Sequence, residues 1–108
     1  MEEHDGSMAL RKVARCADIP PEEARSYECD GKTIAIFNVE GKHYALDGVC
    51  PHREGPLGEG LLEGKIVTCP WHGWRFDVTT GQSPEMPAAK VRQYVIAVAG
   101  EDLWVEID

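Results

Sequence analysis

Apolar and polar residues alternate with a period of two along most of the chain, and turn residues interrupt the alternation at short intervals. Such alternation is typical of β-strands that bury one face. The clearest segment is residues 33–39 (TIAIFNV), which is rich in β-branched and aromatic residues. Gly41 ends this segment, and residues 43–47 (HYALD) follow as its predicted hairpin partner.

Further strands are expected on both sides of this hairpin. A first strand is predicted for residues 10–16, and one short helical turn is predicted to open at Glu22 and Glu23, after two prolines that forbid a strand. The other apolar runs predict strands at residues 25–29, 64–68, 74–77, 91–99 and 103–107. No segment keeps an apolar period of 3.6 residues, so about eight short antiparallel strands predict an all-β sandwich or barrel.

Length and composition indicate a single globular domain. The chain has 108 residues, of which 43% are hydrophobic, enough for one modest core. Residues 1–8 (MEEHDGSM) are acidic and polar, and we expect them to form a flexible tail in front of a domain at residues 9–108.

Net charge and the length of the apolar runs argue against nucleic acids and membranes as partners. Eleven basic against nineteen acidic side chains give a net charge of −8, which repels phosphate backbones and disfavours nucleic-acid binding. No apolar run approaches the roughly 20 residues that span a bilayer, and the N-terminus resembles neither a secretory signal nor a transit peptide. We therefore expect a cytoplasmic protein with reduced thiols, no membrane contact and a monomeric state.

Two short stretches concentrate cysteine and histidine. Cys50-Pro51-His52 is followed, after a gap of sixteen residues, by Cys69-Pro70-Trp71-His72, so half of the four cysteines and half of the four histidines lie here. Both stretches fall between predicted strands, next to glycines. Two thiolates and two imidazoles form a donor set for a soft metal centre. A structural zinc ion with Cys2His2 ligation is one candidate.

The same residues, extended through Gly73-Trp74-Arg75-Phe76-Asp77, resemble the Rieske iron–sulfur domain of small ferredoxins. The resemblance covers most of the chain, including the turn at Thr80-Gly81 and the proline-bearing loop at residues 83–90. It implies one [2Fe-2S] cluster per chain, with Cys50 and Cys69 on one iron and His52 and His72 on the other. It also implies an antiparallel Rieske-domain body with a small cluster-binding lobe, which the loop at residues 83–90 covers.

The resemblance implies a one-electron carrier and not a complete enzyme. Such ferredoxins accept electrons from a flavin-dependent NAD(P)H reductase and pass them to a ring-hydroxylating terminal oxygenase. The chain is not that oxygenase, because only His4 and His43 remain for a mononuclear iron site that needs two histidines and a carboxylate. Two alternatives stay open, namely the small subunit of an assimilatory nitrite reductase and a structural zinc module for protein contacts.

Three positions imply a low reduction potential. Respiratory-chain Rieske proteins have disulfide-bonded cysteines where this chain has Gly55 and Trp71, and a serine where it has Trp74. Fewer hydrogen bonds to the cluster sulfides destabilise the reduced state, so we expect a potential of about −150 mV.

Several other side chains have predicted structural roles. Trp74 and Phe76 are expected to pack the cluster lobe onto the strands, and Trp71 to shield the cluster or to be exposed for docking. Cys16 and Cys29 are expected to be small buried hydrophobic residues. Backbone N–H groups at Gly55, Gly58 and Gly73 could approach the cluster sulfides, and four carboxylates hint at an acidic docking face: Glu54, Glu59, Glu63 and Glu85.

Overall fold

In the computed structural model, the described residues are 9–49, 55–71, 73–86 and 88–107. They form ten strands and two short 3-10 helices. In chain order these are β1 (Ala9–Arg15), η1 (Cys16–Asp18), β2 (Ala24–Cys29), β3 (Lys32–Val39), β4 (Lys42–Asp47), η2 (Leu57–Glu59), β5 (Leu61–Glu63), β6 (Ile66–Thr68), β7 (Arg75–Asp77), β8 (Gln93–Tyr94), β9 (Ile96–Ala99) and β10 (Asp102–Ile107).

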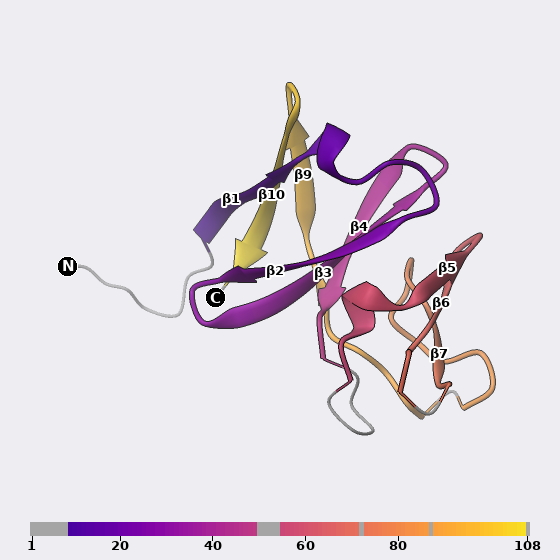
Figure 1. Ribbon diagram of the computed structural model, residues 1–108. Helices are drawn as coiled ribbons and strands as arrows, with labels where there is room; N and C mark the ends of the chain where they lie inside the picture. The colour runs from indigo at the N-terminus through magenta and orange to yellow at the C-terminus, as the bar shows by residue number, and fades with distance from the viewer. Residues whose placement is uncertain (1–8, 50–54, 72, 87, 108) are drawn as a thin grey trace.

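The strands form three antiparallel sheets. Their orders are β1-β10-β9, β2-β3-β4-β8 and β5-β6-β7. Figure 1 shows the small β5-β6-β7 sheet to one side of the two larger sheets. The predicted all-β fold with a body and a smaller lobe is therefore confirmed.

Two tight hairpins organise the central sheet. Asp30 and Gly31 join β2 to β3 with φ angles of 53° and 79°, and Glu40 and Gly41 join β3 to β4 with φ angles of 53° and 93°. Positive φ at both central residues is the signature of the type I′ turn, whose twist matches that of the flanking strands. The register pairs Phe37 with Tyr44.

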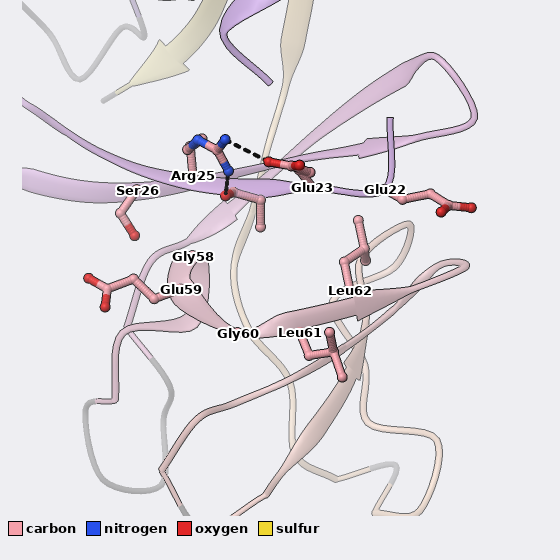
Figure 2. Close-up of a pocket in the computed structure, with 10 residues that line it drawn as sticks. Glu22, Glu23, Arg25, Ser26, Gly58, Glu59, Gly60, Leu61 and Leu62 are labelled. Atoms are coloured by element: carbon pink, nitrogen blue, oxygen red, sulfur yellow. Dashed lines mark hydrogen bonds and ion pairs between the residues drawn. The ribbon is translucent and has the colours of Figure 1, made fainter. Parts of the chain in front are cut away.

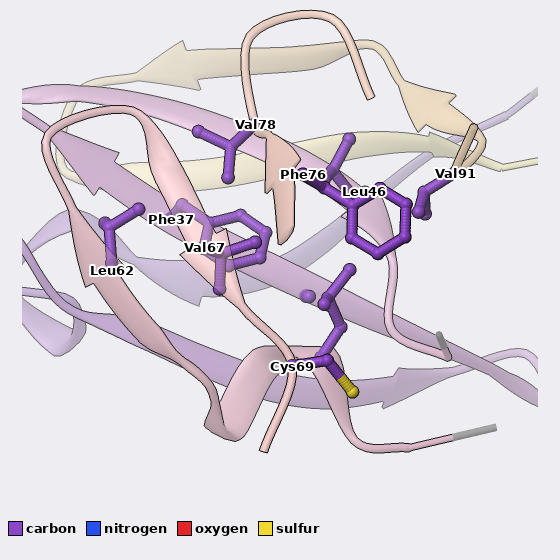
Figure 3. Close-up of a cluster of buried hydrophobic side chains, with 10 residues drawn as sticks. Phe37, Leu46, Leu62, Val67, Cys69, Phe76, Val78 and Val91 are labelled. Carbon is purple, nitrogen blue, oxygen red and sulfur yellow. The ribbon is translucent and has the colours of Figure 1, made fainter. Parts of the chain in front are cut away.

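Both faces of β3 are buried, which explains its unbroken apolar run. Ala35 and Phe37 belong to a first core cluster, and Ile34 and Ile36 belong to a second. The first cluster joins the central sheet to the small sheet and contains Leu46, Leu57, Leu62, Val67, Cys69, Phe76, Val78 and Val91 (Figure 3). The second lies between the central sheet and the β1-β10-β9 sheet and contains Ile19, Ala45, Tyr94, Leu103 and Val105.

Four details of the predicted elements were wrong. The helical turn lies at Cys16–Asp18, because Glu22 has a φ angle of 67°, which a right-handed helix does not allow. The apolar run at residues 91–99 divides into β8 and β9, which belong to different sheets. Strand β5 was not predicted, and the strand predicted to begin at residue 64 begins at Ile66.

Candidate metal centre

Cys69 lies at the end of a buried strand in the small sheet. It follows β6 directly and is 1% exposed, as a member of the first core cluster. Figure 3 shows its side chain at the edge of that cluster, with the sulfur pointing away from Phe76 and Val67. The backbone of Cys69 is therefore anchored by the core, while its sulfur faces the loops beyond the sheet.

A closed turn follows Cys69. The Cys69 N–H donates a hydrogen bond to the Trp74 carbonyl oxygen over 2.7 Å, which closes residues 69–74 into a loop. Gly73 has a φ angle of 71° and allows this turn without strain. Trp74 packs against the first core cluster, with its ring centroid 6.4 Å from that of Phe76. Trp74 and Phe76 therefore anchor the lobe, as predicted.

Gly55 contacts this turn where no side chain would fit. A Cβ atom on Gly55 would lie 2.8 Å from the Cys69 sulfur and 3.0 Å from the Trp71 Cβ. Gly55 has no positive φ angle, so it is required here for space and not for backbone conformation. Positions 55 and 71 are therefore adjacent in the structure, and the Trp71 side chain is 51% exposed.

The described residues before and after the first cysteine–histidine stretch pair with each other. Val49 and Pro56 form an antiparallel bridge, and the Leu57 N–H donates to the Gly48 carbonyl oxygen over 3.0 Å. Gly55 directly precedes Pro56 of this bridge and contacts the Cys69 sulfur. Cys50, His52 and His72 themselves lie outside the described residues.

The donor set and its surroundings fit the expected cluster. The buried thiol of Cys69 directly follows β6, and Gly55, shortly after the first cysteine–histidine stretch in sequence, contacts its sulfur. Within the part of the chain that the structure describes, no group of three His, Cys, Asp or Glu side chains converges. This absence is expected, because three of the four predicted ligands lie outside the described residues.

The proline-bearing loop at residues 83–90 is tied to the small sheet. The Ser83 N–H donates to the Ala89 carbonyl oxygen over 3.0 Å, and the Met86 N–H donates to the buried Ser83 hydroxyl over 3.2 Å. Arg75 of β7 forms an ion pair with Glu85, with an Nε–Oε2 distance of 2.8 Å. The hydrogen bond from Arg75 lowers the pKa of Glu85. Pro87 lies outside the described residues.

Asp77 organises the turn that leads into this loop, a role that the sequence analysis missed. Its Oδ1 accepts hydrogen bonds from the Thr79 N–H over 2.9 Å and from the Thr79 hydroxyl over 2.6 Å, and Lys65 lies 3.3 Å from Oδ2. Burial alone would raise the pKa of Asp77, but the hydrogen bonds from Thr79 and Lys65 outweigh burial and lower it. The Asp-x-Thr pattern is the signal that could have identified this turn.

The remaining glycine, cysteine and histidine residues named in the sequence analysis lie in different environments. A Cβ atom on Gly58 would meet Ser26 and the Arg25 carbonyl, so this glycine serves packing against β2. Cys16 and Cys29 form no disulfide and are half-buried against the second cluster, not fully buried as predicted. His43 is buried in β4, and its Nε2 has no hydrogen-bond partner among the described residues.

The four carboxylates of the suggested docking face have different surroundings. Glu85 forms an ion pair with Arg75. Glu59 in η2 and Glu63 in β5 are exposed. Glu54 lies outside the described residues. Among the described residues, none of the helices is long and apolar enough to cross a bilayer.

Known proteins resemble this chain over nearly its whole length. Residues 9–95 match the Rieske [2Fe-2S] domain family. The ferredoxin component of biphenyl 2,3-dioxygenase from Rhodococcus jostii is 33% identical over 94% of this chain and 95% of its own length. The ferredoxin of carbazole 1,9a-dioxygenase from Nocardioides aromaticivorans superposes with a TM-score of 0.83 at 27% identity, covering 93% of this chain and 99% of that one. A ferredoxin solved in a complex of reduced oxygenase and oxidised ferredoxin in carbazole 1,9a-dioxygenase gives a TM-score of 0.82 at 28% identity, with coverages of 90% and 92%.

Proposed function

The chain belongs to the Rieske [2Fe-2S] domain family, and from this premise we propose that it is the ferredoxin component of a ring-hydroxylating oxygenase system. It carries one electron at a time and is not itself the catalytic subunit. The observation that carries the proposal is the close contact of Gly55 with the buried Cys69 sulfur, within a chain that matches this family over residues 9–95.

We assign four side chains to the cluster. Cys50 and Cys69 would hold one iron, and His52 and His72 would hold the other. When bound, the cluster supplies a one-electron couple, and its neutral imidazole ligands raise its potential above that of an all-thiolate centre. The ligand assignment rests on the order and spacing of the motif and on the position of Cys69 beside Gly55.

The protein contributes rigidity and exclusion of water. Cys69 is fixed by the core at 1% exposure, and the Trp74 carbonyl holds its backbone in a closed turn. The Arg75–Glu85 ion pair attaches the loop at residues 83–90 to the same lobe. A Cys69 thiol that the core holds in place suits a carrier that must gain and lose an electron repeatedly.

The names of the relatives support the proposed electron-transfer partners. A related ferredoxin is known in complex with its oxygenase, which supports a terminal oxygenase as the electron acceptor of this chain. A flavin-dependent NAD(P)H reductase as the electron donor, a cytoplasmic location and a monomeric state belong to the same proposal. The named relatives favour this role over a nitrite reductase subunit or a zinc module.

Stopped-flow spectroscopy tests this function. Dithionite-reduced protein is mixed anaerobically with the oxidised terminal oxygenase of a ring-hydroxylating system from the same organism, and re-oxidation of the carrier is followed in visible light. We expect one electron to leave per chain. Failure of the oxygenase to re-oxidise the carrier, with both proteins fully loaded, would contradict the proposed role.

A further inference from the structure

A groove lies between β2 and the segment that runs from η2 into β5 (Figure 2). Its volume is about 500 Å³, and residues 22–26 and 58–62 line it. Gly60 forms part of its floor, where a Cβ atom would collide with the Thr68 carbonyl. Since Thr68 directly precedes Cys69, the groove adjoins the segment that leads into the metal centre.

The charges in the groove are mainly negative and only partly compensated. Arg25 turns back onto its own strand, with Nη1 donating to the Ala24 carbonyl over 2.8 Å and Nη2 lying 2.6 Å from the Glu23 carboxylate. Within the described part of the chain, the carboxylates of Glu22 and Glu59 have no ion-pair partner. Figure 2 shows them at opposite ends of the groove.

An exposed aliphatic side chain lies on the wall of the groove that β5 forms, and Figure 2 shows it pointing away from β2. Leu61 is 63% exposed, whereas its neighbour Leu62 is buried in the first core cluster. Large exposed apolar side chains beside a concave, charged rim are typical of protein contacts. The groove therefore complements a protein segment that presents a cation next to an apolar side chain.

We propose that this groove docks a segment of the terminal oxygenase that carries Lys or Arg beside an aliphatic residue. The inference rests on the proposed function. The electron acceptor, and not the electron donor, is the expected occupant because reduction of the carrier and binding of a cationic segment are electrostatically linked. Reduction adds one negative charge to the protein, so a cationic segment bound in this groove favours the reduced form over the oxidised form. The acceptor must bind the reduced carrier and release the oxidised one, whereas an electron donor needs the opposite preference.

Two matched variants test the electrostatic part of this docking. Glu22→Gln with Glu59→Gln removes the uncompensated charges of the groove, and Glu28→Gln with Glu106→Gln removes the same charge outside it. The dissociation constant of each reduced, cluster-loaded protein for the terminal oxygenase is measured anaerobically at low and high salt. We expect the groove variant to bind roughly three- to tenfold more weakly with a smaller salt dependence, and the control to stay within about twofold of the wild type.

A third variant, Leu61→Gln, tests the apolar contact. It should weaken oxygenase binding and leave the salt dependence unchanged, because no charge is altered. Two results would overturn the docking proposal. One is an equal loss of oxygenase affinity in the groove and control variants. The other is a groove variant that binds the reductase more weakly but binds the oxygenase as tightly as the wild type. If the wild type binds no oxygenase, the proposed function fails. If the wild type binds and the groove variants bind equally well, the docking site alone is wrong.

Discussion

Replacing Gly55 by alanine perturbs the metal centre at one defined contact. The added Cβ would lie 2.8 Å from the Cys69 sulfur and 3.0 Å from the Trp71 Cβ. Non-bonded heavy atoms have their optimum separation at about 3.5–4.0 Å, so the sulfur or the loop must move by roughly half an ångström or more. Overpacking of this kind costs about 1–3 kcal/mol. The reduced entropy of the unfolded chain offsets about 0.4–1 kcal/mol of that cost.

We therefore expect Gly55→Ala to lose stability by about 1–2 kcal/mol and to bind less iron per chain. Iron and acid-labile sulfide per chain, visible absorption and guanidinium unfolding measure the two effects. Gly64→Ala is the matched control, because Gly64 has a φ angle of 63° and open space around it. It should lose about 1–2 kcal/mol through backbone strain while it retains its iron. A Gly55→Ala protein with the iron content and stability of the wild type would refute the close approach of residue 55 to the Cys69 sulfur.

Two further predictions concern ligands and acid stability. His52→Ala and His72→Ala should each lose the visible absorption, whereas Cys16→Ser should retain it; a wild-type EPR signal in either reduced histidine variant would refute the ligand assignment. The pKa of Asp77 is lower in the folded chain than its ordinary value, so its stabilisation is present above the unfolded pKa of about 3.9 and is lost as pH falls through the folded pKa. Thr79→Val should cost about 1 kcal/mol at pH 6 and progressively less below about pH 4 in urea unfolding; an equal cost at pH 6 and pH 3 would contradict the role of Asp77.

Local residue patterns predicted most of the fold but not its long-range pairings. The β-branched run at residues 33–39 and the turn at Gly41 predicted the central hairpin because both signals are local. The division of residues 91–99 could not be predicted, since Tyr94 pairs with Ala45 and Ile96 pairs with Val105 in another sheet. Strand β5 has only three residues, too few for a period of two to stand out.

The sequence predicts four side chains as ligands of the metal centre, and the structure describes how one of them, Cys69, is held. The motif identified Cys69, and its burial at the end of β6 and the anchoring by Trp74 agree with its predicted role. The requirement for glycine at position 55 was beyond sequence reasoning, because it depends on a bridge between Val49 and Pro56 that brings a distant segment to the sulfur. The groove was unpredictable for the same reason, since its two walls are more than thirty residues apart.

A potentiometric titration followed by EPR tests the central claim most directly. The purified protein is poised at a series of potentials at neutral pH, and the unpaired spins per chain are counted at each. We predict a single one-electron transition at about −150 mV, the low end of the Rieske range, with one spin per reduced chain. A potential above about +100 mV would contradict the role as an oxygenase ferredoxin, and a protein without an iron-based signal at any potential would contradict the Rieske centre itself.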